Sequence, residues 1–164
     1  MLQIYFEDLE ELVRKTVVRK SDFSEPLTRD FVEKYVKLTG DDALSHTSVS
    51  YNLLYNHKDI FIPGLAMPIL AEVLFRKSYP YFVHIIRDFH LKLLKPLYPG
   101  DRIHVVEDFI DFKDDPRLIV DNSSPVSCKR KIKNQDGKVT AHFNIDYLIK
   151  RKEINAPAGI RTRV

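Results

Sequence analysis

The chain has 164 residues, of which 44% are hydrophobic, so we expect one domain with a substantial core. Its 26 Lys and Arg against 23 Asp and Glu leave a formal net charge of only +3, which argues against nucleic-acid binding and is compatible with a phosphate-bearing ligand. A single cysteine, Cys128, excludes an intramolecular disulfide; without a signal peptide or a run of about 18 apolar residues, we expect a cytoplasmic protein with no membrane association.

The first third of the chain predicts a strand, a helix and a loop. Residues 12–20 alternate loosely and are rich in valine, which predicts a first strand. From Thr28 onward apolar residues recur at helical spacing; Thr28 can cap this helix and Gly40 ends it. Residues 41–46 should therefore form a loop, and a short helix should follow through residues 51–55.

The centre of the chain predicts a buried helix. Residues 65–75 are apolar on nearly every side, and only Glu72 interrupts them. Pro68 is acceptable if this helix begins near Gly64, because the N–H groups of a first turn have no helical partner.

The rest of the chain predicts four long strands, at residues 81–95, 102–113, 117–132 and 138–149, separated by well-marked turns. Pro125 lies in the third and predicts a bulge or an interruption there. After the last strand we expect a solvated basic tail over residues 151–164. One strand, then helices, then four strands predict a single α+β domain over residues 1–150, with an antiparallel sheet wrapped around one helix.

Five short phrases occur in order along the chain. They are Tyr-Phe-Glu-Asp-Leu at 5–9, Leu-Thr-Gly-Asp at 38–41 with His46 after it, Gly64 before the central helix, Pro-x-x-x-Gly-Asp at 96–101, and Asn-Gln-x-Gly at 134–137. Over residues 5–149 this set resembles the MaoC-like dehydratases and (R)-specific enoyl-CoA hydratases. The resemblance implies the hot-dog fold, in which an antiparallel sheet wraps around a long central helix.

The resemblance also implies an activity, the hydration of 2-enoyl thioesters or the dehydration of 3-hydroxyacyl thioesters, carried by CoA or acyl carrier protein. It assigns Asp41 and His46 to the water and the proton transfers, and the N–H of Gly64 to the thioester oxygen. These residue types suit those tasks, because a carboxylate accepts a proton, histidine titrates near neutral pH, and an N–H at a helix start favours a developing negative charge. It implies no cofactor and no metal, and as partner a second copy in a homodimer that pairs sheets edge to edge, or a dimer of dimers.

The residues themselves leave other assignments open. Asp42 is a rival acid, because residues four apart meet on a helix. Asp41 is also placed to cap the next helix, and His46 is also placed to bond to the backbone. His57 is a second, weaker candidate histidine.

The function has alternatives as well. Ala43 and Leu44 stand where the family usually has Asn and Pro, which favours a catalytically inactive acyl-CoA-binding or structural subunit with the same fold. A hot-dog acyl-CoA thioesterase is the third hypothesis. It would use a carboxylate on the central helix, where Glu72 is the only acid.

Overall fold

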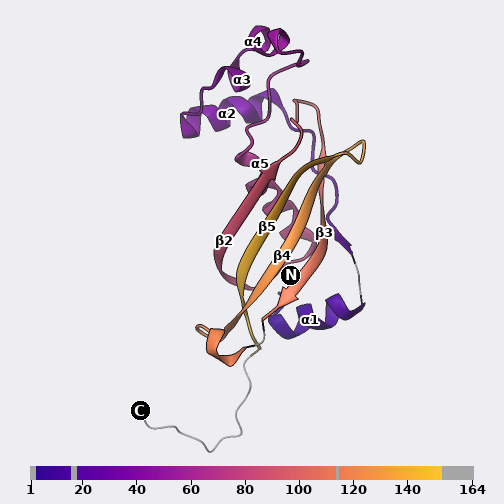
Figure 1. Ribbon diagram of the computed structural model, residues 1–164, viewed down its shortest axis with the longest axis vertical. Coiled ribbons are helices and arrows are strands. Elements are labelled where there is room, and N and C mark those ends of the chain that lie inside the picture. The colour runs from indigo at the N-terminus through magenta and orange to yellow at the C-terminus, as the bar shows by residue number, and fades with distance from the viewer. Residues whose placement is uncertain (1–2, 16–17, 114, 153–164) are drawn as a thin grey trace, which may run out of the picture.

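A five-stranded antiparallel sheet curls around one long helix in the computed structural model, which describes residues 3–15, 18–113 and 115–152 (Figure 1). The strand order is β1-β3-β4-β5-β2. The strands are β1 (Arg19–Lys20), β2 (Val83–Leu93), β3 (Ile103–Phe112), β4 (Ser123–Asn134) and β5 (Val139–Lys150). The predicted α+β architecture is therefore confirmed.

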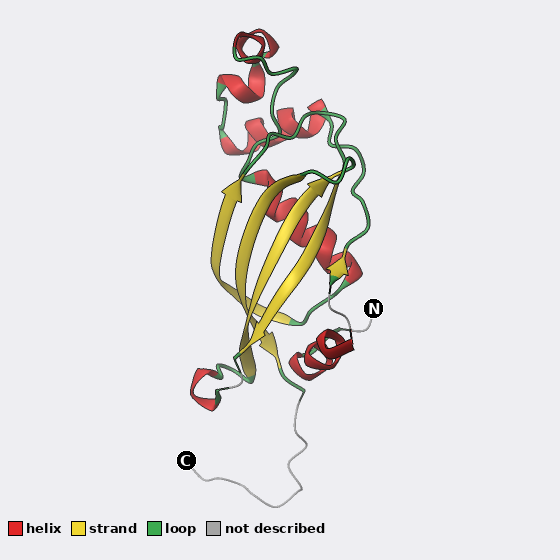
Figure 2. Ribbon diagram, turned by 45° about the vertical axis from the view of Figure 1, so that its right-hand side comes forward, coloured by secondary structure: helices red, strands yellow, loops and turns green. Residues whose placement is uncertain are grey.

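The central helix is α5 (Ala66–Ser78), which runs along the inner face of the curved sheet (Figure 2). Met67, Ala71 and Phe75, four residues apart, are all buried, as expected of one helix face packed on a sheet. Pro68 lies in the first turn, where its missing N–H leaves no helical hydrogen bond broken. Within the described residues, no helix is long and apolar enough to cross a membrane.

Three short helices gather at one end of the sheet: α2 (Arg29–Thr39), α3 (Leu44–Thr47) and α4 (Val49–Leu54) (Figure 1). Thr28 caps α2 as predicted, because its Oγ1 accepts a hydrogen bond from Phe31 N at 3.1 Å. Gly40 ends α2 as predicted, with φ +73°. The predicted loop over residues 41–46 is too long, since its last three residues already belong to α3.

The predicted strand over residues 12–20 is mostly wrong. Helix α1 (Phe6–Lys15) occupies its first part, residues 16–17 lie outside the described residues, and only the two-residue β1 is a strand. Ion pairs four residues apart, Glu10 with Arg14 and Glu11 with Lys15, favour the helix over a strand. Phe6 and Leu9 are buried and anchor one face of α1.

Strand β4 runs through Pro125 without a break, so the interruption predicted there is wrong. The pairing of Pro125 with Leu148 keeps the register of its neighbours, and the register shift lies instead at Ile132 and Lys133. Pro125 O accepts a hydrogen bond from Lys113 N, one residue beyond the end of β3. The N–H group that Pro125 lacks would face β3 as well. Because the hydrogen bonds between β3 and β4 already end at this point, its absence disturbs the sheet little. The strand also begins later than predicted, after a 3-10 helix at Pro116–Leu118.

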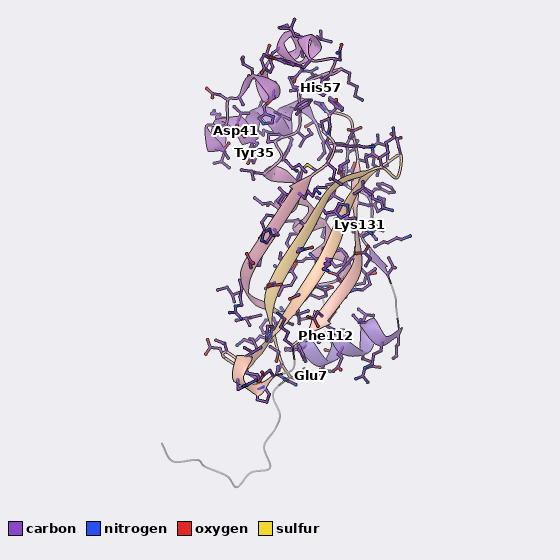
Figure 3. All side chains as sticks on the ribbon, viewed as in Figure 1. Glu7, Tyr35, Asp41, His57, Phe112 and Lys131 are labelled. Atoms are coloured by element: carbon purple, nitrogen blue, oxygen red, sulfur yellow. The ribbon has the colours of Figure 1, made fainter. Side chains whose placement is uncertain are left out.

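The end of β5 is tied to α1. Arg151 Nε lies 3.0 Å from Glu7 Oε1, and Lys152 N donates to Glu7 Oε2 at 3.0 Å. Glu7 lies at the end of the molecule opposite to Asp41 (Figure 3). The remainder of the predicted basic tail, residues 153–164, lies outside the described residues.

Candidate active site

His46 is held by the main chain of a distant segment. Its Nδ1 lies 3.0 Å from the carbonyl oxygen of Phe61, and Phe61 N donates to Ser45 O at 2.8 Å. A carbonyl oxygen only accepts, so Nδ1 carries the proton in this contact. The neutral ring therefore presents an unprotonated Nε2, the atom that a general base needs.

That free nitrogen faces Asp41. His46 Nε2 lies 3.7 Å from Asp41 Oδ2, which is longer than a direct hydrogen bond and leaves both atoms within reach of one water molecule. The turn at Gly40 reverses the chain after α2 and sets the position of Asp41. The imidazole is 13% exposed and the carboxylate 37%, so the pair sits at the edge of the interior.

The structure does not favour the two alternatives, which are Asp42 as the acid beside His46 and Asp41 as a helix cap. Asp42 is exposed, and its carbonyl oxygen accepts a hydrogen bond from Thr47 Oγ1 at 3.3 Å. The residue before α3 is Ala43, and no side chain caps this helix. Asp41 is thus the acid that faces His46, and the helix-capping alternative for it does not apply.

Gly64 and His46 line the same pocket, which has a volume of about 370 Å³. Gly64 lies just before α5, and among the described residues its N–H donates to no other group. The pocket walls are mostly apolar and include Met67 of α5 and Leu94 after β2. A polar base, a free N–H at a helix start and apolar walls are the parts that a carbonyl substrate requires.

Leu93, the last residue of β2, lies directly over Gly64. A Cβ atom added to Gly64 would overlap Leu93 Cδ1. Leu93 is about half exposed and lines the same pocket as Gly64, so its side chain fills the space beside this glycine. The sequence carries no signal for Leu93 or Phe61, because their roles follow from contacts between distant segments.

His57 takes a different role from His46. Its Nδ1 lies 3.2 Å from the hydroxyl of Tyr98, and its ring packs edge-on against Phe61. Phe61 also packs against Tyr98. His57 is not among the residues lining the pocket; its cluster fixes the segment whose carbonyl holds His46.

Glu72 is engaged in the core. Its Oε2 accepts hydrogen bonds from Arg130 Nη1 and from the hydroxyl of Tyr147, both at 2.5 Å. Burial raises the pKa of Tyr147 well above its usual value, so the hydroxyl keeps the proton that it donates. Arg130 Nε donates in turn to Glu107 at 2.6 Å. A carboxylate held in this way is poorly placed to act on a substrate.

Solved structures resemble the chain over nearly its whole length. No protein-family model matches it, and no curated protein matches its sequence. A monoamine oxidase regulatory protein from Archaeoglobus fulgius superimposes with a TM-score of 0.76 at 18% identity, covering 92% of this chain and 97% of that one. The chain has the hot-dog fold of the MaoC-like proteins.

Two further structures agree on this hot-dog fold. The R-hydratase PhaJ1 from Pseudomonas aeruginosa matches with a TM-score of 0.69 at 16% identity, covering 98% of this chain and 97% of that one. A MaoC-like dehydratase from Rhodospirillum rubrum matches with a TM-score of 0.71 at 16% identity, covering 92% and 99%. The expected hot-dog fold is thus confirmed.

Proposed function

We propose that this hot-dog protein is a hydratase or dehydratase acting on 2-enoyl or 3-hydroxyacyl thioesters of CoA or acyl carrier protein. One observation carries the proposal. His46, with Nε2 free and facing Asp41, lines the same pocket as the unpaired N–H of Gly64. The likeness to an R-hydratase and to a MaoC-like dehydratase supports the same reaction class.

The proposed reaction uses all three groups. A water molecule lies between Asp41 Oδ2 and His46 Nε2, and the pair removes one of its protons as its oxygen attacks the β-carbon. The electron pair of the double bond moves toward the thioester oxygen, where the Gly64 N–H and the start of α5 stabilise the negative charge. The pair then returns a proton to the α-carbon, so neither side chain has changed its protonation after one turnover. Dehydration is the reverse.

The pocket favours this proposal over an inactive subunit. Leu44 and Tyr51 are the side chains best placed in sequence to fill a loop that has lost its Asn-Pro pair. Leu44 is 56% exposed, and neither residue lines the pocket. The Ala43–Leu44 replacement therefore leaves the pocket open.

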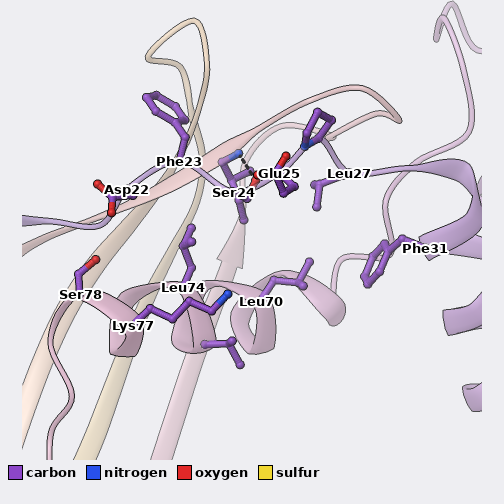
Figure 4. Close-up of a pocket in the computed structure, with 13 residues that line it drawn as sticks. Asp22, Phe23, Ser24, Glu25, Leu27, Phe31, Leu70, Leu74, Lys77 and Ser78 are labelled. Atoms are coloured by element: carbon purple, nitrogen blue, oxygen red, sulfur yellow. Dashed lines mark hydrogen bonds between the residues drawn. The ribbon is translucent and has the colours of Figure 1, made fainter. Parts of the chain in front are cut away.

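A second hollow supports the proposal that the substrate carries an acyl chain. It has a volume of about 380 Å³ and lies between residues 22–27 and helix α5, with Phe31 at one end (Figure 4). Leu70 and Leu74 form its floor, one and two turns beyond Met67 of the catalytic pocket. We propose that longer acyl chains extend from the catalytic pocket along this side of α5.

A second copy of the chain is the proposed partner. Strand β2 is an edge of the described sheet, and an unpaired edge invites another strand. Phe89 and Leu93 on this strand are 38% and 51% exposed, and Ile69 and Val73 on α5 are 64% and 54% exposed. We propose that two copies pair through β2 and cover these apolar side chains, as a homodimer or within a dimer of dimers.

Crotonyl-CoA hydration tests the activity. We expect wild-type turnover and a loss of roughly 10² to 10⁴-fold in kcat for Asp41→Asn and for His46→Ala, since each removes a proton-transfer group. Asp42→Asn is the matched control and should retain activity. Equal turnover by all four proteins would contradict the proposed roles.

Two further readouts address the alternatives. Release of free CoA without hydrated product would favour a thioesterase. Binding of crotonyl-CoA without any turnover would favour an inactive acyl-CoA-binding subunit.

A further inference from the structure

The face of the sheet turned away from α5 carries a basic hollow. Its volume is about 380 Å³, and its polar lining consists of His90, Lys92, Lys129, His142 and Asn144. Side chains alternate between the two faces of a strand, and Phe143 and Arg130 are buried on the inner face. Their neighbours on β5 and β4 therefore point outward. The described residues that line this hollow include no acid.

The strand register brings these side chains together. Lys92 lies opposite His142 on the next strand, and His90 lies opposite Asn144. On the other side of β5, Lys129 is the partner of Asn144. Residues directly opposite on one face have Cβ atoms about 5 Å apart, so these five side chains converge on one small area.

The charges on this face change sign along the sheet. The next row beyond His90 and Asn144 holds Asp88 opposite Asp146. Toward the other end, Lys131 is the β4 partner of His142, and its Nζ pairs with Asp108. An anion near this face is therefore repelled from the row of aspartates and attracted to the basic hollow.

The hollow lies beside the candidate active site. Leu94 lines both the basic hollow and the pocket that holds His46 and Gly64. With a rise of about 3.3 Å per residue along a strand, Lys92 and His90 lie roughly 7 and 13 Å from Leu94. A flexible thioester carrier that leaves the pocket around the end of β2 would pass over this hollow.

We infer that the basic hollow binds a phosphate group on the carrier part of the substrate, either coenzyme A or the phosphopantetheine arm of acyl carrier protein. The inference rests on the proposed thioester activity and adds where its carrier is held. Lysine supplies three N–H donors, imidazole one or two, and the Asn144 amide two, while phosphate oxygens only accept. Lys92 and His142 act here as binding residues, outside the proton transfers at His46.

Kinetics with different carriers test the inference. The double variant Lys92→Gln/His142→Gln is compared with wild type on crotonyl-CoA, on crotonyl-acyl carrier protein and on the phosphate-free crotonyl-N-acetylcysteamine. We expect the KM advantage of the phosphate-bearing carriers over N-acetylcysteamine to fall about tenfold, the loss of two partly exposed charged contacts. Lys133→Gln is the matched control: its lysine is on β4 outside the hollow, and the advantage should persist.

The three carriers also separate the two sources of phosphate. A larger loss with crotonyl-acyl carrier protein would assign the hollow to the phosphopantetheine arm, and a larger loss with crotonyl-CoA would assign it to the nucleotide of coenzyme A. An unchanged carrier preference in the double variant overturns the inference, as does an equal loss in Lys133→Gln, since that would show a general effect of net charge.

Binding to the basic hollow can also be measured independently of turnover. The imidazole C2–H signals of His90 and His142 are followed by NMR as free coenzyme A or phosphate-free pantetheine is added. We expect both signals to shift with coenzyme A and to stay in place with pantetheine. If no thioester is hydrated but these shifts occur, the proposed activity fails and the phosphate site stands; the absence of shifts overturns the site whether or not the enzyme turns over.

Discussion

Arg130 Nη1 lies 2.5 Å from Glu72 Oε2, so strand β4 and helix α5 are joined by a charged contact inside the core. Arg130 is fully buried and also binds Glu107, which pairs with Arg19 of β1. Two arginines and two glutamates thus balance in charge between the helix and the sheet. Removing one partner of such a set leaves a buried charge uncompensated, whereas the complete set is close to neutral in its effect on stability.

Replacing Arg130 should therefore strongly destabilise the folded protein. We expect Arg130→Met to lower the free energy of unfolding by about 3 to 5 kcal/mol, because it leaves Glu72 and Glu107 buried with one cation between them. Urea unfolding followed by circular dichroism measures the change. Lys133→Met, on the same strand and partly exposed, should stay within about 0.5 kcal/mol of wild type. A loss in Arg130→Met as small as that of the control would show that Arg130 is not needed to compensate the two buried glutamates.

Gly64 should tolerate a side chain only if Leu93 gives way. In Gly64→Ala the new Cβ overlaps Leu93 Cδ1, so the side chain of Leu93 must move within the pocket that it shares with Gly64. We expect kcat for crotonyl-CoA hydration to fall at least about tenfold, since the added methyl group and the shifted Leu93 crowd the pocket beside the proposed oxyanion donor. Leu93→Ala should restore much of this activity in the double variant. No recovery there would mean that the alanine acts on the substrate directly.

Gly40 links stability to the position of Asp41. At φ +73° an alanine is strained, so Gly40→Ala should cost about 1 kcal/mol of unfolding free energy. It should also lower crotonyl-CoA hydration, because the next residue is the proposed catalytic acid. Gly137→Ala is the matched control, since its glycine has φ +75° in the β4–β5 turn. It should lose similar stability and keep its activity; equal activity in both variants would separate the Gly40 turn from catalysis.

Cys128 should be inert in the folded protein. Burial raises the pKa of its thiol to about 11, so at pH 8 only about one molecule in a thousand carries the reactive thiolate. Alkylation by iodoacetamide, measured by mass spectrometry, should be negligible at pH 8 in the native protein. It should be complete in urea and should rise as the pH approaches 11. Rapid native labelling at pH 8 would contradict the buried placement.

The hollow along α5 should set the length of the acyl chain. Leu74→Trp places a larger side chain on its floor, so kcat/KM for long-chain enoyl-CoAs should fall about tenfold or more while crotonyl-CoA hydration is retained. A series of enoyl-CoAs of graded length provides the measurement. Leu118→Trp, in the 3-10 helix outside this hollow, is the control. The same loss for every chain length would place the acyl chain elsewhere.

The fold was predictable where local signals were strong. Thr28 and Gly40 bracket α2 through side-chain capping and a left-handed turn, both of which act within a few residues. Two predictions were wrong, one because of local interactions and one because of long-range pairing. In α1, ion pairs four residues apart and the burial of Phe6 outweigh the strand pattern of the valines that follow. At Pro125 the expected break is absent because the hydrogen bonds between β3 and β4 end there. No local sequence pattern shows where the pairing of two strands ends.

The residues of the candidate site could be proposed from the sequence, but the contacts that surround them could not. The sequence suggested Asp41, His46 and Gly64, and the structure brings His46 beside Asp41 and into one pocket with Gly64. The contact of Leu93 with Gly64 was beyond prediction, because it joins the end of an edge strand to the start of α5. The pairing of Glu72 with Arg130 likewise joins residues 58 positions apart, which only the folded sheet brings together.

The support beneath His46 comes from peptide groups and not from side chains. Phe61 gives its carbonyl to the imidazole and its N–H to Ser45, and every residue except proline has both groups. Substitutions at Ala43 and Leu44 can therefore accumulate without turning the ring, so long as the Phe61, His57 and Tyr98 side chains keep the path of the supporting segment. Divergence in this part of the sequence is consequently a poor measure of divergence in chemistry.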